Sequence, residues 1–163
     1  MSDINLQTLD LYQQIYLVDE SQIVPVKENK KIENTLIFRG SALKRLLFVY
    51  HEPKNWNGAD EKMIQTLITN GLKLALQDIM LLNLFENNTP DWQTIINELK
   101  PEKIIFWGCD AYAEIASLAK QPYTIHQNEG YRYLLVHTAS AFHDDKDLKT
   151  KLWASIKNLF ELL

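Results

Sequence analysis

The strongest constraint on the fold is an alternation that begins at Arg45, in which short apolar runs are separated by longer amphipathic segments. Continuous apolar runs are typical of strands buried on both faces, and apolar residues at a spacing of three to four are typical of helices. The expected strands cover residues 45–50, 78–84, 103–107, 123–126 and 131–137, and the expected helices cover 59–74, 90–99, 110–118 and 148–162. Strands that alternate with helices require crossover connections. The pattern therefore predicts a three-layer α/β/α sandwich with a mainly parallel sheet.

Residues 1–40 differ from this pattern and are interpreted as an N-terminal extension to a domain of residues 41–163. A polar break at Lys27–Lys31 and a turn signal at Gly40-Ser41 separate the two. Apolar residues at helical spacing predict a short amphipathic helix early in the extension. They are Leu6, Leu9, Tyr12 and Tyr16. This helix either folds back over its own sheet or binds a partner protein. Two β-rich runs, at 23–26 and 35–38, predict edge strands.

Composition limits the classes of partner. The 163 residues carry a net charge of −4, whereas proteins that bind duplex DNA usually present a basic face. Nucleic acid is therefore expected to be a weak or indirect partner. The single cysteine, Cys109, excludes an internal disulfide. His51, His126 and His143 lack metal-ligand spacing, so we expect neither a metal nor a cofactor.

The first residues of the sequence and the length of its longest apolar stretch bear on localisation. Asp3 and Asp10 occupy the region where a signal peptide needs basic and then apolar residues. The longest strongly apolar stretch, residues 79–85, is far shorter than the roughly 20 residues that span a bilayer. We therefore expect a cytoplasmic protein without a membrane partner.

Ligands of parallel sheets bind beyond the carboxyl ends of the strands, so the residues that follow each apolar run are the candidates for a site. They are His51-Glu52-Pro53, Asn83-Leu84-Phe85, Gly108-Cys109-Asp110 and His137-Thr138-Ala139-Ser140. The expected topology brings all four groups to one edge of the sheet.

Two of these strand ends resemble the uracil-DNA glycosylase superfamily over roughly residues 45–160. Leu81-Leu82-Asn83-Leu84 is similar to a strand end whose asparagine reads the uracil edge, and the segment 105–112 is similar to the following strand and helix start. Glu52-Pro53 lies where the family has an acid-proline motif, and His137 with Ser140 lies where it has His-Pro-Ser. The resemblance implies a glycosylase-like fold and removal of uracil from DNA.

Base excision requires a set of groups that this chain nominally contains. A carboxylate, Glu52, would orient water or stabilise the sugar cation, and an amide, Asn83, would read the pyrimidine. His137 would stabilise charge on the leaving base, and Phe85 or Trp56 would stack on it. Each residue also has a structural interpretation: Glu52 as a solvated loop acid or helix cap, Asn83 as a turn or backbone-capping amide, and His137 as a hydrogen-bonded histidine in a partly buried strand end.

Three departures from the glycosylase pattern favour a protein without this activity. Tyr50 and His51 stand where the family has glycine, the loop at 53–58 is short, and Thr138 replaces the proline of His-Pro-Ser. A bulky side chain at the glycine position would obstruct the pocket.

A second resemblance, to the psi-subunit family of bacterial DNA polymerase III, accommodates these losses, because that family has a degenerate glycosylase-like fold without the activity. It rests on the Leu- and Gln-rich segment at 6–15, on Ala139-Ser140-Ala141-Phe142, and on Lys151-Leu152-Trp153 before the end of the chain.

Three hypotheses follow from the sequence. The preferred one is a non-catalytic adaptor that binds protein partners in DNA replication, with Tyr50, His51, Phe85 and Ser140 lining its cleft. The second is an active uracil-DNA glycosylase that uses Glu52, Asn83 and His137. The third is an unrelated α/β domain that binds a small ligand. An open, uracil-sized cleft between Glu52 and His137 favours the enzyme, and a cleft filled by side chains favours the adaptor.

Overall fold

The computed structural model describes residues 36–109, 112–118 and 121–162. The compact unit that contains them begins at Leu36, whereas the sequence interpretation began the domain at residue 41. The predicted helix with Leu6, Leu9, Tyr12 and Tyr16, and the predicted strand at 23–26, lie outside the described residues.

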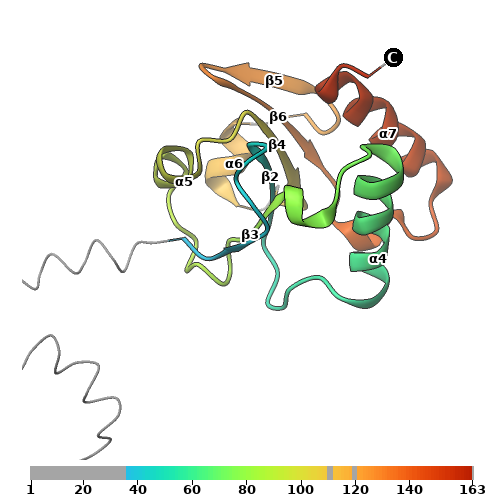
Figure 1. The fold of residues 1–163 in the computed structure, drawn as a ribbon, viewed down its shortest axis with the longest axis horizontal. Coiled ribbons are helices and arrows are strands. Elements are labelled where there is room, and N and C mark those ends of the chain that lie inside the picture. Colours follow the sequence, from blue (N-terminus) through green and yellow to red (C-terminus); the bar gives the residue numbers. More distant parts are fainter. Residues whose placement is uncertain (1–35, 110–111, 119–120, 163) are drawn as a thin grey trace, which may run out of the picture. The chain divides into compact units, whose positions relative to one another are not determined.

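Within the described ranges, six strands form a single sheet (Figure 1). They are β1 (Phe38–Arg39), β2 (Leu46–Tyr50), β3 (Met80–Asn83), β4 (Lys103–Trp107), β5 (Ile125–Asn128) and β6 (Tyr131–Val136). Their order is β1-β3-β2-β4-β6-β5. The four inner strands run parallel, while β1 and β5 pair antiparallel at the two edges. The predicted α/β class and mainly parallel sheet are confirmed.

Helices pack against both faces of this sheet because its inner strands are apolar on both sides. They are α4 (Gly58–Thr66), α5 (Trp92–Leu99), α6 (Ala113–Leu118) and α7 (Lys146–Phe160). In β2, Phe48 packs in one core cluster with residues of α4 and α7, and its neighbour Val49 packs in a second cluster with residues of α5 and α6. This is the alternation that a strand buried on both faces requires.

Several helix boundaries differ from those predicted, for local reasons. The expected helix at 59–74 is α4 followed by a π-helical turn, Leu67–Gly71. Helix α5 begins at Trp92 because the Asp91 side chain accepts a hydrogen bond from the Thr94 backbone N–H at 2.9 Å. In the same way, the Asp145 carboxylate accepts from the Leu148 N–H, so α7 begins two residues before the predicted start at Leu148.

The strands expected at 78–84 and 123–126 appear as β3 and β5 with shifted bounds, and further differences concern the first edge strand and the third helix. The predicted strand at 35–38 appears as β1, which is shifted toward Arg39, and Thr35 is outside the described residues. The expected helix at 110–118 appears as α6 from Ala113 onward. None of the described helices is both long enough and apolar enough to cross a membrane.

Candidate functional site

The candidate site is the edge of the sheet at which the four parallel strands end. Tyr50, the last residue of β2, pairs in register with Asn83 of β3 and with Trp107 of β4. Trp107 in turn pairs with Val136, the last residue of β6. The segments that carry Glu52, Asn83, Gly108 and His137 therefore leave the sheet side by side.

Asn83 is the buried polar centre of this edge, with 3% of its surface exposed. Its Oδ1 accepts hydrogen bonds from the backbone N–H of Glu52 at 3.2 Å and of Phe85 at 3.1 Å. Its Nδ2 donates to the Glu52 carbonyl at 2.9 Å and to Asn55 Oδ1 at 3.2 Å. A side-chain amide has two donors and two acceptor lone pairs, so all four positions of Asn83 are used within the chain. The amide holds the loop after β2 against the end of β3.

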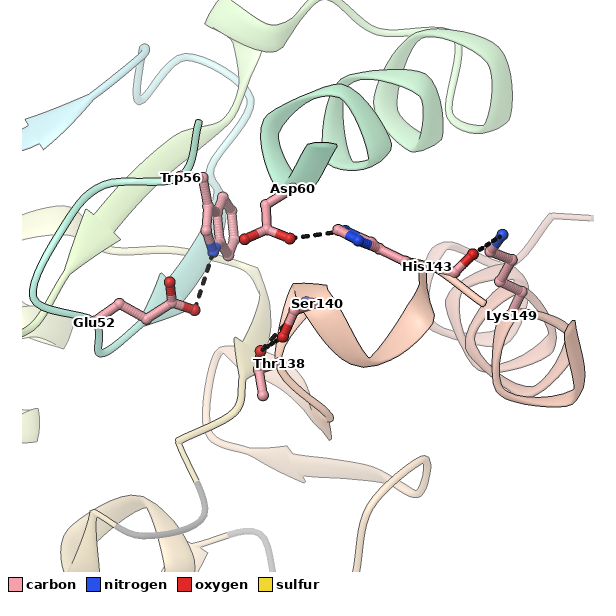
Figure 2. A network of polar contacts seen from close by, with 7 residues as sticks. All are labelled: Glu52, Trp56, Asp60, Thr138, Ser140, His143 and Lys149. Carbon is pink, nitrogen blue, oxygen red and sulfur yellow. Dashed lines mark hydrogen bonds and ion pairs between the residues drawn. The ribbon is translucent and has the colours of Figure 1, made fainter. Parts of the chain in front are cut away.

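Glu52 is held in this loop and is partly buried. Its Oε1 accepts a hydrogen bond from the Trp56 indole N–H at 3.4 Å, shown in Figure 2. Burial raises the pKa of the Glu52 carboxyl above its ordinary value, with a smaller contribution from the Asp60 charge, and the Trp56 hydrogen bond opposes the rise. Glu52 therefore has the raised pKa that a general acid or base needs. Its backbone N–H and carbonyl are both hydrogen-bonded to the Asn83 amide.

Aromatic side chains fill the space beside Asn83. Tyr50 is fully buried, and its ring stacks on Trp56 with 4.0 Å between centroids. Trp56 is itself 3% exposed and meets Trp107 edge-on at 5.8 Å. The Tyr50 hydroxyl donates to Asn55 Oδ1 at 2.6 Å and accepts from Arg39 at 3.1 Å. Burial raises the pKa of this hydroxyl. Where the glycosylase pattern has glycine, this chain has a large ring packed into the core.

His137 and Ser140 lie farther along the same edge and are exposed. The Nδ1 atom of His137 shares a hydrogen bond of 2.5 Å with the Tyr123 hydroxyl. Ser140 and Thr138 bond to each other through their hydroxyls at 3.1 Å, as Figure 2 shows. Gly108 faces this segment with a φ of +66°, and a Cβ added there would lie 2.8 Å from Thr138 Cβ. Glycine at 108 therefore allows the end of β4 to lie against the segment after β6.

An exposed aromatic cluster marks the outer side of the edge. The His51 ring lies 5.8 Å from Phe85 and 6.4 Å from Tyr112, and Phe85 is 51% exposed. The Tyr112 hydroxyl donates to the Pro90 carbonyl at 2.8 Å, and burial together with the Glu114 carboxylate raises its pKa to about 12. Tyr112 is thus fixed, while His51 and Phe85 present ring surface to solvent.

Among the described residues, Glu52 and His137 line different depressions. Glu52 lines a depression of about 380 Å³ together with Asn55 and Asp60. His137 lines a separate cavity of about 40 Å³ between the ends of β6 and Pro122. In the part of the chain that the structure describes, no group of three His, Cys, Asp or Glu side chains is placed to hold a metal ion.

The sequence interpretation missed two groups that shape this region. One is Asn55, which connects the Tyr50 hydroxyl to the Asn83 amide. The other is the pair of Asp60 and His143, whose carboxylate and Nε2 lie 2.8 Å apart and join α4 to the segment before α7 (Figure 2). A polar loop residue and two residues far apart in sequence give no periodic signal, so neither group was predictable from the pattern.

Comparison with known proteins adds no assignment. No family model matches the sequence, and no curated protein matches it.

Proposed function

We propose that this protein is a non-catalytic adaptor with a uracil-DNA glycosylase-like fold, similar to the psi subunit of bacterial DNA polymerase III, and that it binds protein partners of the cytoplasmic replication machinery. The observation that carries the proposal is that the polar groups at the strand-end edge are already hydrogen-bonded within the chain. Asn83, the residue expected to read uracil, uses all four of its side-chain hydrogen-bonding positions to bind the Glu52–Asn55 loop and Phe85. Reading a base would require these bonds to break.

Packing supports the same conclusion. The stacked rings of Tyr50 and Trp56 are buried, so the space next to Asn83 contains protein rather than solvent. Glu52 and His137, the other two catalytic candidates, line separate depressions. An enzyme that acts on a flipped base needs these groups around one pocket that admits the base.

Charge is consistent with a protein partner. The net charge of −4 offers little counterion release, which supplies most of the non-specific affinity for duplex DNA. We expect weak, salt-sensitive DNA binding at most. An affinity tighter than the roughly 10⁻⁴ to 10⁻⁶ M typical of non-specific binding at physiological salt would contradict this expectation.

The decisive test is an assay for uracil release from single-stranded and duplex DNA with the purified full chain. The adaptor proposal predicts no release above that of a protein-free control. Release by the wild-type chain that disappears in Glu52→Ala and Asn83→Ala variants would overturn the adaptor proposal and establish the glycosylase alternative.

The adaptor role has a second test, on the N-terminal segment. If Leu6, Leu9, Tyr12 and Tyr16 dock on a partner, a chain that starts near residue 21 keeps its melting temperature and loses a replication protein that the full chain retains in a pull-down. If these residues pack on the sheet, removing four large apolar side chains costs roughly 1.5–3 kcal/mol each, and the shortened chain unfolds. Unfolding, with no replication protein retained by the intact chain, would contradict the proposal.

A further inference from the structure

A groove between α4 and α7 leaves tryptophan and methionine side chains partly exposed, whereas Trp56 at the strand-end edge is buried. The groove has a volume of about 550 Å³ and lies where the two helices run beside each other in Figure 1. Its lining is mainly apolar, with side chains from both helices. The lining residues are Ala59, Lys62, Met63, Thr66, Leu67, His143, Lys149, Leu152 and Trp153.

The apolar residues of this groove are of the kinds that protein interfaces use. Trp153 packs against the core and keeps part of its surface exposed, and tryptophan is among the residue types most enriched in binding hot spots. Met63, also partly exposed, has a flexible side chain that adapts to a partner's shape. Large apolar side chains that remain partly in water between two helices form a surface that a third helix can cover.

The backbone beside the groove has an unusual conformation. The segment Leu67–Gly71 forms a π-helical turn, and the Leu72 N–H donates to the Leu67 carbonyl at 3.0 Å. Gly71 ends this turn against Trp153, because a Cβ at Gly71 would lie 2.9 Å from the indole ring. Single π-helical turns are rare and occur frequently at functional sites. The π-helical turn and Trp153 are therefore in direct contact at one side of the groove.

The charges at the groove have one sign. Lys62 and Lys149 are the charged residues of its lining, and the lining contains no carboxylate. Lys149 Nζ donates to the His143 carbonyl at 3.1 Å, which holds its ammonium group at the groove (Figure 2). Of the two acids in the first turn of α4, Asp60 is paired with His143 at 2.8 Å and Glu61 with Arg39 at 3.9 Å. An occupant with carboxylates flanking an apolar stripe would complement this arrangement.

We propose that the groove between α4 and α7 binds an acidic amphipathic helix of a partner protein, with an apolar stripe against Trp153 and Met63 and carboxylates toward Lys62 and Lys149. The 15 residues of α7 correspond to about 22 Å of helix, enough to lie along about four turns of such a partner. The inference rests on the proposed function only in making the occupant a protein. Beyond that function, it specifies which surface binds the partner and which side chains recognise it.

The test uses the full chain and three labelled helical peptides of about four turns. One peptide has a leucine stripe flanked by glutamates, the second has the same stripe flanked by lysines, and the third has the glutamate composition with the stripe scrambled. Fluorescence anisotropy at physiological salt measures binding. We expect the glutamate-flanked peptide to bind at least about tenfold more tightly than the other two. Equal binding of all three would overturn the proposal.

A charge reversal identifies the surface. The double variant Lys62→Glu/Lys149→Glu should weaken binding of the glutamate-flanked peptide by about fivefold to tenfold and should strengthen binding of the lysine-flanked one. The matched control is Lys100→Glu/Lys151→Glu, which makes the same charge change at exposed lysines that do not line the groove. All four lysines are exposed, so thermal melts should show that each variant folds. Equal effects of the two double variants would contradict the proposal, because binding would then follow net charge.

A second copy of this chain is the competing occupant. Sedimentation of the full chain tests it: a dimer that the Lys62→Glu/Lys149→Glu variant dissociates, and the control variant does not, would replace the partner helix by self-association. These outcomes are distinguishable from failure of the proposed function, since uracil release is measured on DNA and involves none of the groove lysines.

Discussion

The strand-end edge and the α4–α7 groove both contain tryptophan beside polar residues, but they differ in whether their groups are already satisfied. At the edge, Trp56 is buried beneath Tyr50, and the amide of Asn83 has a partner for every donor and acceptor. At the groove, Trp153 and Met63 remain partly exposed between two lysines. Groups that satisfy one another stabilise the fold, whereas apolar surface left in water is available for binding. By this comparison the surroundings of Asn83 are structural, whereas exposed apolar surface lies at Phe85 on the outer side of the edge and in the groove.

The largest expected effect tests whether the edge is a structural core. Tyr50→Ala removes a fully buried ring that stacks on Trp56. We expect a loss of about 3–5 kcal/mol in the free energy of unfolding, measured by urea denaturation, because the site cannot fully collapse around the cavity. Tyr50→Phe, which removes only the hydroxyl and its bonds to Asn55 and Arg39, should cost about 1 kcal/mol. A cost below about 1 kcal/mol for Tyr50→Ala would mean that the ring is dispensable and the edge is open.

Asn83→Ala tests the contribution of the hydrogen bonds that the Asn83 amide makes to the loop after β2. It leaves the partly buried backbone N–H groups of Glu52 and Phe85 without their acceptor. We expect a loss of about 3 kcal/mol in the free energy of unfolding, since each buried unsatisfied group costs about 1–3 kcal/mol. Asn57→Ala is the control, because Asn57 is exposed and its side chain does not cap α4, so its effect should stay within about 0.5 kcal/mol. Equal stabilities of the two variants would show that Asn83 is free to serve a ligand.

Gly108→Ala tests the close approach of β4 to the segment after β6. A Cβ at this position meets Thr138 at 2.8 Å, and the φ of +66° is unfavourable for alanine. We expect a loss of about 1–3 kcal/mol in chemical denaturation. Gly130→Ala is the matched control, because Gly130 also has a positive φ, +85°, but has open space around it. If both substitutions cost the same, the contact with Thr138 contributes nothing beyond backbone strain.

The smallest expected effect concerns the charge of Glu52. Burial raises its pKa in the folded protein above the ordinary value of 4.5, so the folded state holds the proton more tightly than the unfolded chain does. Stability should therefore fall as pH rises from below 4.5 through the folded-state pKa. Glu52→Gln removes this dependence and keeps an acceptor for Trp56. The variant should gain slightly over wild type as pH rises from 4 to 7, in urea midpoints taken at both values. If the wild type instead gains stability relative to the variant over this pH range, the pKa of Glu52 is lowered in the folded protein by a favourable partner.

Local sequence pattern predicted the elements because apolar periodicity reports burial, and burial alternates differently in strands and helices. The strand at 103–107 has the bounds that the apolar run predicted, and the N-termini of α5 and α7 differ by two residues because Asp91 and Asp145 cap them. The same pattern indicated which strand ends share an edge, since parallel strands end on one side. It could not tell whether Asn83 faces a cavity or a loop.

Tertiary structure alone decided what the nominated residues do. Asn83 meets Glu52 across 31 positions of sequence because β3 lies beside β2, and nothing in either segment specifies that neighbour. Trp153 has the spacing of an ordinary core residue in α7, and only the way in which α4 and α7 pack leaves part of its indole exposed in a groove. Periodicity depends on residues within one element, whereas hydrogen-bond saturation and exposed grooves depend on how distant elements meet. The sequence by itself therefore determined the α/β elements and the edge where the strands end. The tertiary structure decided that the Asn83 amide at this edge is hydrogen-bonded within the chain and that Trp153 lines the α4–α7 groove.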